Sequence, residues 1–139
     1  VSDVKTSAER AAAKGIELSF YNVNISSASA SALLLEMKEK GLKAGFAFNA
    51  ANFTACGENP FLGSYKHKLR RFIDQLDIED MAFDHSPRAF EKGNAEIKEL
   101  ISILRCQSFS GHFVLSAGNR HHGDLLAAVG EFIRLLREM

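Results

Sequence analysis

Along this chain, segments whose apolar residues repeat with the period of a helix alternate with segments that have the pattern of a strand. The pattern is clearest over residues 93–119. Four apolar residues between Ile97 and Leu104 recur at i, i+3, i+4 and i+7, which predicts an amphipathic helix. The short apolar run 112–115 follows a glycine and predicts a strand covered on both faces. Small polar residues follow it, and such strand ends are where α/β proteins bind ligands.

The same unit recurs along the whole chain. Helix-forming residues closed by glycine alternate with short aliphatic and aromatic runs. The predicted order begins with helix 2–14, strand 16–23, a helix from the 24–31 segment to Gly41, and strand 43–49. It continues with loop 52–64, a helix from Tyr65 through Leu69, Phe72, Ile73 and Leu76, strand 78–84 and loop 84–92. It ends with a helix from Ile97, strand 112–115, and a last helix with the apolar stripe Leu125, Leu126, Val129, Phe132, Ile133 and Leu136.

Strands that are joined by helices run parallel with right-handed crossovers. No linker, low-complexity run or change of composition interrupts the 139 residues, so we expect a single α/β domain. The sequence therefore predicts four parallel strands alternating with helices.

Composition narrows the function classes. Apolar residues make up 46% of the chain, which is enough for a core, and 17 basic residues balance 17 acidic ones. The chain therefore has no net positive charge that would favour binding to nucleic acid. No apolar run is long enough for a membrane span. Cys56 and Cys106 lack paired spacing, which favours reduced thiols in a cytoplasmic protein.

Four segments, in order, carry a family resemblance: AAAKGIELSFYN, GLKAGFAFNAANFTACGENP, DMAFDHSPRAFEKGNAEIKELISIL and FSGHFVLSAGN. Together they resemble the C-terminal half of a xylose-isomerase-like (β/α)8 barrel, the superfamily of sugar and sugar-phosphate isomerases and epimerases that includes endonuclease IV. The segment GLKAGFAFN is also similar to the strand ending KxGxALNP of ribulose-phosphate 3-epimerases, another (β/α)8 family, with Ala50 in place of proline.

The resemblance implies a divalent metal held at four strand ends by Glu, Asp, His and Glu. The corresponding residues here lack the charge to hold such an ion, and the family's Asp-x-x-His has become Asn49-x-x-Asn52. We therefore predict no metal and no cofactor. The four positions aligned with the ligands are Tyr21, Asn49, Ala82 and Ser116.

Two clusters at predicted strand ends are candidates for chemistry. Asp84 and His85 would be a catalytic acid–base pair, or else part of a solvated loop. Asn119, Arg120 and His121 precede the last helix, where backbone N–H groups and an arginine can bind phosphate. The alternative for this second cluster is a polar surface loop.

Amides gather at the same predicted edge of the sheet. Asn22, Asn49 and Asn52, together with Ser116, could bind sugar hydroxyls, or the amides could cap strands and helices. The basic run from Lys66 to Arg71 has helical spacing and is expected to be a solvated face rather than a nucleic-acid site.

Half of a barrel would leave two open edges and an exposed inner face. We therefore expect a homodimer, a missing N-terminal half-barrel, or an open doubly wound sheet with helices on both faces. The expected function is that of a sugar-phosphate isomerase or epimerase acting on or binding a small sugar or sugar phosphate, or of a non-catalytic binding module with the same fold. Neither nucleic acid nor a membrane is an expected partner. The apolar inner face would consist of Phe20, Phe46, Phe48, Phe83, Phe113 and Leu115 or their neighbours.

Overall fold

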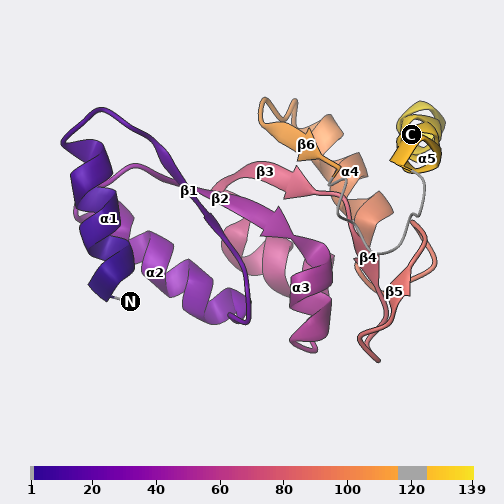
Figure 1. Cartoon of the computed structure of the whole chain (residues 1–139), viewed down its shortest axis with the longest axis horizontal. Helices are drawn as coiled ribbons and strands as arrows, with labels where there is room; N and C mark the ends of the chain where they lie inside the picture. The colour runs from indigo at the N-terminus through magenta and orange to yellow at the C-terminus, as the bar shows by residue number, and fades with distance from the viewer. Residues whose placement is uncertain (1, 116–124) are drawn as a thin grey trace.

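The computed structural model describes residues 2–115 and 125–139 and arranges them around one mixed α/β core (Figure 1). The helix α1 and the helix α5 lie at opposite ends of the molecule's longest axis. The elements are α1 (Ser2–Ala12), β1 (Leu18–Tyr21), α2 (Ser27–Glu39), β2 (Ala44–Asn49), α3 (Ala50–Ala55), the π-helix η1 (Pro60–Leu69), β3 (Ile73–Asp77), β4 (Asp80–Met81), β5 (Pro87–Arg88), α4 (Ile97–Cys106), β6 (His112–Val114) and α5 (Leu125–Glu138).

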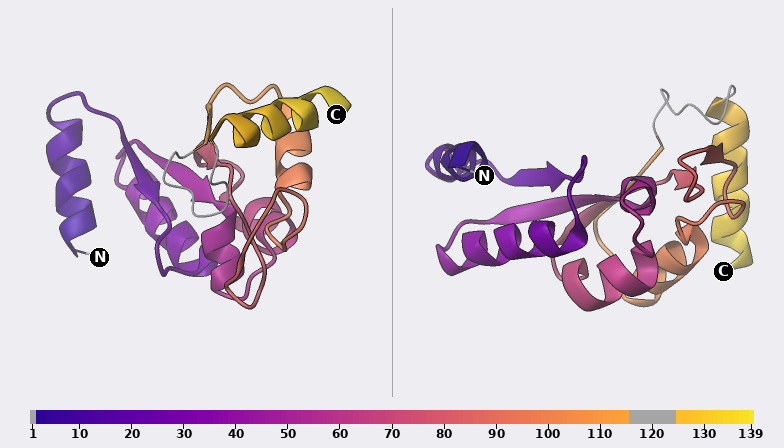
Figure 2. Two further views of the ribbon diagram at one scale, coloured as in Figure 1. Left: turned by 45° about the vertical axis from the view of Figure 1, so that its right-hand side comes forward. Right: turned by 90° about the horizontal axis from the view of Figure 1, so that it is seen from below.

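The main sheet has four parallel strands in the order β1-β2-β3-β6. The prediction of parallel strands alternating with helices is thus confirmed. Seen from below, α2, η1 and α4 lie on one side of this sheet (Figure 2). The order follows the sequence without the reversal that marks the switch point of a doubly wound sheet, which argues against that alternative. The described strands do not form a closed barrel, since β1 and β6 each pair with a single neighbour.

Phenylalanines fill the layer between the sheet and its helices. Phe46 and Phe48 of β2 are at most 2% exposed and belong to one core with residues of α2, η1 and α4. The ring of Phe48 lies 4.9 Å from that of Phe53 and 6.5 Å from that of Tyr65, centroid to centroid. The expectation of an open inner face is therefore wrong for Phe46 and Phe48. Phe20, Phe113 and Leu115 are partly buried against the same core, and Phe83 is 46% exposed. Side chains alternate along a strand, so Gly45, Ala47 and Asn49 of β2 lie on the other face.

That other face is polar. The Asp74 side chain lies so close over Gly45 that a Cβ atom there would stand 1.7 Å from its Oδ2 atom. Ser19 of β1 donates a hydrogen bond of 2.7 Å to Asp74 Oδ1. Because carboxylates and hydroxyls are hydrated at little cost, this face does not need an apolar cover.

The sequence assignment fails between residues 52 and 84. The predicted loop contains α3 and the start of η1, and β3 occupies Ile73–Asp77, where a helix was predicted. Of the predicted strand 78–84, only Asp80–Met81 is extended, in a two-stranded antiparallel ribbon with Pro87–Arg88. The assignment fails because the apolar residues of β3 continue the helical spacing of η1. In addition, the register between β2 and β3 is irregular, so the residues of β3 do not show the apolar–polar alternation expected of a strand.

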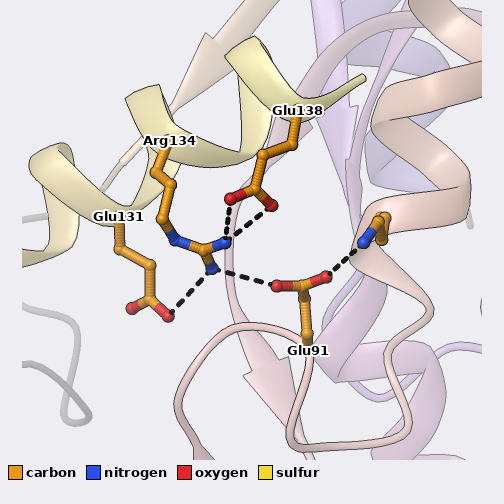
Figure 3. Close-up of polar contacts among 5 residues, drawn as sticks. Glu91, Glu131, Arg134 and Glu138 are labelled. Carbon is orange, nitrogen blue, oxygen red and sulfur yellow. Dashed lines mark hydrogen bonds and ion pairs between the residues drawn. The ribbon is translucent and has the colours of Figure 1, made fainter.

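The last helix packs on the core by a narrower stripe than predicted. Ala128 and Leu135 are buried, while Leu126 is 80% and Ile133 41% exposed. The ring of Phe132 packs against Phe113 of β6 at a centroid distance of 5.9 Å. Ion pairs complete the contact: Arg134 lies between Glu138 of its own helix, at 2.7 Å, and Glu91 of the loop before α4, at 3.1 Å (Figure 3).

Candidate functional site

The carboxyl ends of three parallel strands bring four polar side chains together on the polar face of the sheet. Tyr21 ends β1, Asn49 ends β2, Asp77 ends β3, and Glu79 follows two residues later. Asn49 Nδ2 donates to the Tyr21 hydroxyl at 2.6 Å and to Glu79 Oε2 at 3.0 Å. We refer to these four residues as the strand-end site.

The phenol of Tyr21 is held between an amide and a carboxylate. Its oxygen accepts the hydrogen bond from Asn49, and its hydroxyl donates to Asp77. Partial burial, the negative charges of Asp77 and Glu79, and the hydrogen bond to Asp77 raise the pKa of Tyr21 well above its usual value. The phenol is therefore a neutral hydrogen-bond donor throughout the physiological pH range, although 45% of the residue remains exposed to solvent.

The predicted amides do meet, but most of their hydrogen bonds are made within the protein. Asn22 donates from Nδ2 to the Asn49 carbonyl and accepts from the Asn49 N–H, each at 2.8 Å. Asn52 donates from Nδ2 to the Asn22 carbonyl at 2.6 Å. The Asn52 N–H donates to the side-chain oxygen Oδ1 of Asn49, which is the N-cap residue of α3. Asn22 and Asn52 thus fasten the end of β1 to the start of α3. Only Asn49 presents its amide hydrogens to the other strand-end residues.

The two carboxylates differ in how many hydrogen bonds they accept. Asp77 accepts from Tyr21 and, at 2.7 Å, from Gln75 Nε2. Glu79 accepts the single bond from Asn49 Nδ2. Both side chains are half-buried, and both lie beside a neutral proton donor. Such a set can bind hydroxyl and carbonyl groups and can exchange protons with them.

The proposed acid–base pair lies elsewhere, in the turn that joins β4 to β5. Asp84 and His85 are both exposed, and Asp84 accepts hydrogen bonds from the N–H and hydroxyl of Ser86. These bonds lower the pKa of Asp84, aided by Arg88 at 3.6 Å. The structure brings neither residue into contact with Tyr21, Asn49 or Asp77. The other candidates, Ser116, Asn119, Arg120 and His121, lie outside the described residues.

The strand-end site does not fit the divalent metal that the family resemblance implies. Among the residues described, no three His, Cys, Asp or Glu side chains are grouped as a metal site would require. Two carboxylates, a phenol and an amide whose oxygen caps α3 leave too few free oxygen ligands for Mn²⁺ or Mg²⁺. No step below is derived through a metal.

Sequence reasoning missed Asp77 and Glu79 because it placed the third strand after them. Because β3 ends at Asp77, the third strand of the main sheet does not end at Ala82, which lies beyond β4. The available signal was the run of Asp77, Glu79 and Asp80 directly after alternating residues, which is typical of a strand end.

The chain matches no protein-family model, and no curated protein or solved structure matches it at a significant level. Within the described ranges, every helix is too short or too polar to cross a membrane.

Proposed function

We propose that this chain binds a small sugar or sugar phosphate at the strand-end site and isomerises or epimerises it by proton transfer. One observation carries the proposal: the Tyr21 hydroxyl is fixed between Asn49 and Asp77, with Glu79 beside it, at the carboxyl edge of a parallel sheet. Ligands of α/β proteins bind at this edge. A neutral donor and a carboxylate acceptor are complementary to the hydroxyl and carbonyl groups of a sugar.

Isomerisation and epimerisation both move a proton on the carbon next to a carbonyl group. We assign Glu79 as the base, because Asp77 already accepts hydrogen bonds from Tyr21 and Gln75. The Glu79 carboxylate takes the carbon-bound proton. The single hydrogen of the Tyr21 hydroxyl turns from Asp77 to the carbonyl oxygen, where negative charge develops. Return of the proton to the former carbonyl carbon, while the proton of the adjacent hydroxyl passes to the former carbonyl oxygen, gives the isomer. Protonation of the first carbon by solvent on the face opposite Glu79 gives the epimer.

The family resemblance supports the substrate class. Four parallel strands in sequential order are what half of a (β/α)8 barrel would have, and in that arrangement Asp77 would stand at the third family position. Asp77-x-x-Asp80 also repeats the spacing of the family's His-x-x-Asp, with Asp in place of His. The half-barrel assignment is part of this proposal.

The test is hydrogen–deuterium exchange at carbon, followed by proton NMR on a panel of aldoses, ketoses and their phosphates in heavy water. Loss of a general acid or base typically lowers the rate by about 10²–10⁴-fold, so we expect that loss for Glu79→Gln and for Tyr21→Phe. Asp84→Asn is the matched control, because its carboxylate lies in the exposed β4–β5 turn, and it should keep the wild-type rate.

Saturation-transfer NMR on the same panel separates the two candidate functions. Binding without exchange would favour a non-catalytic binding module of the same fold. Absence of both binding and exchange for every sugar would refute the strand-end site as a sugar site. Exchange that is lost in Asp84→Asn and kept in Glu79→Gln would return the chemistry to the β4–β5 turn.

A further inference from the structure

A polar hollow lies at the end of the sheet opposite to the strand-end site, where η1 ends and the chain turns into β3. It encloses about 450 Å³, and the residues that line it are all basic. We call it the basic hollow, and it is formed by Lys66, His67, Lys68, Arg70 and Arg71.

Its positive charge is concentrated and mostly unpaired. Four of the six residues from Lys66 to Arg71 are Lys or Arg, although the whole chain has a net charge of zero. In the part of the chain that the structure describes, Lys66, Arg70 and Arg71 form no ion pair. Elsewhere, six basic residues lie within 4.0 Å of a carboxylate: Lys5, Lys40, Lys43, Arg88, Lys98 and Arg134. Other described basic residues, such as Arg10 and Lys14, also form no ion pair, so the clustering of the charges is what distinguishes the hollow.

Compensation of the helix dipole does not account for so much charge. The carboxyl end of a helix carries the equivalent of about half a negative charge, which one lysine or arginine offsets. Lys68 is already engaged, since its Nζ donates to the Ser27 hydroxyl at 2.8 Å and its charge lies near Glu58. Three cations remain with no anion to balance them, and they repel one another unless an anion binds between them.

The hollow is built on a fixed backbone. The Arg70 N–H donates to the carbonyl of Tyr65, five residues earlier, in the wide winding of a π-helix, which is rare and frequent at functional sites. Tyr65 and Leu69 anchor this turn in the core at no more than 1% exposure. The Arg71 guanidinium lies 5.6 Å from the centre of the Phe72 ring, which restricts its orientation.

We propose that the basic hollow binds a short polyphosphate chain, either inorganic or carried by a nucleoside. Arginine and lysine donors converging on one hollow match the closely spaced oxygens of linked phosphates. The unpaired charge is confined to one turn and does not form the extended stripe that tracks a nucleic-acid backbone. The hollow lies at the amino end of β3 and the strand-end site at the carboxyl end, so this proposal is independent of the proposed function.

The test is isothermal titration of the whole chain with inorganic tripolyphosphate at low ionic strength, with inorganic phosphate as the comparison. We expect tripolyphosphate to bind more tightly than phosphate and its affinity to fall as salt is added. Arg70→Gln combined with Arg71→Gln should weaken binding by about tenfold or more, because charge-assisted hydrogen bonds are the strong ones. Both side chains are exposed, so this variant should remain folded.

Arg10→Gln combined with Lys14→Gln is the matched control, since it removes the same charge from the exposed surface at α1 and should leave the affinity unchanged. A parallel titration with ATP identifies the source: equal affinity means that the phosphates alone are recognised, and tighter binding means that a nucleoside contributes. No binding of tripolyphosphate at low salt, or equal losses in both double variants, would overturn the proposal. So would much tighter binding of a single-stranded RNA oligonucleotide, which would identify a nucleic-acid surface instead.

Discussion

At the scale of single residues, Asp80 holds the segment before α4 in place. It is 1% exposed, and its carboxylate accepts hydrogen bonds from the N–H groups of Met81, Gly93 and Ala95 at 2.8, 3.0 and 3.1 Å. We expect Asp80→Ala to lower the free energy of unfolding by about 3 kcal/mol, since one buried and two partly buried donors lose their acceptor and a fully buried unpaired donor costs roughly 1–3 kcal/mol. Denaturant unfolding followed by circular dichroism measures this change.

Gly93→Ala tests the same contact from the other side. A Cβ atom there would lie 2.2 Å from Asp80 Oδ1 and 2.7 Å from the Met81 carbonyl, so this variant should also be destabilised. Asp84→Asn, in the exposed turn between β4 and β5, should unfold at the wild-type denaturant concentration. An Asp80→Ala protein as stable as the wild type would contradict this assignment.

Glu58 gives the fold a predictable response to acid. Partial burial opposes ionisation, but hydrogen bonds from the Ser27 hydroxyl and N–H and from Ser64, with the charge of Lys68, outweigh it and lower the pKa of Glu58. A carboxyl whose folded pKa is depressed stabilises the fold above its unfolded pKa, near 4.5, and loses this effect as the pH falls through the folded value.

We therefore expect Glu58→Gln to be less stable than the wild type at neutral pH and to lose less stability between neutral pH and acid. Thermal unfolding measured at a series of pH values tests this, with Ser64→Ala as an intermediate case because it removes one donor. Parallel pH profiles for the wild type and Glu58→Gln would contradict the prediction.

Some of the candidate site could be read from the sequence. Tyr21 and Asn49 end strands that the apolar pattern located, so their place at one edge of the sheet was predictable. The roles of Asn22 and Asn52 were not, because an amide that caps a helix and an amide that binds a ligand have the same sequence context. Asp77 was hidden, since the helical spacing of the preceding apolar residues continues through its strand.

At the scale of elements, burial and not charge holds α5 on the core. Leu135 is fully buried, whereas the ion pairs of Arg134 with Glu91 and Glu138 are exposed to solvent (Figure 3). We expect Leu135→Ala to lower the free energy of unfolding by about 2–5 kcal/mol. Arg134→Gln should have a much smaller effect that disappears at high salt, because exposed ion pairs are weak and screened. Urea unfolding at two salt concentrations compares them, and a larger loss for Arg134→Gln would contradict this ranking.

The predictability of the elements follows the strength of their periodic signal. Helix α4 was predicted closely, because all four of its periodic apolar residues are buried and a strand could not bury them together. In the stretch from Pro60 to Asp77, a π-helix with an unusual turn leads into a strand with an irregular register. Neither element has the period that identifies ordinary helices or strands, so tertiary contacts and not local pattern decide the structure there.

At the scale of the whole molecule, the two edge strands of the sheet have unpaired backbone groups, which favour association with another chain. The homodimer expected from an open phenylalanine face has lost that argument, because Phe46 and Phe48 are buried in the core and Phe20 and Phe113 pack against it. The edge strands β1 and β6 still lack a second neighbour among the described residues. Val23, just after β1, is 61% exposed, and Ile133 lies on α5, the helix packed against β6.

We therefore predict that two chains close into a dimer by head-to-tail contacts at both edges, with the β1 edge of each chain against the β6 edge of its partner. Light scattering should give twice the mass of one chain, and Val23→Lys and Ile133→Lys should each shift the protein towards the monomer, since a buried lysine without a partner is unfavourable. Leu62→Lys is the matched control, because Leu62 is 50% exposed on η1, away from both edges, and it should remain dimeric. Mixing the two edge variants should restore a dimer, since one pair of edges is then intact. A wild-type monomer, or edge variants that do not complement each other, would contradict head-to-tail association.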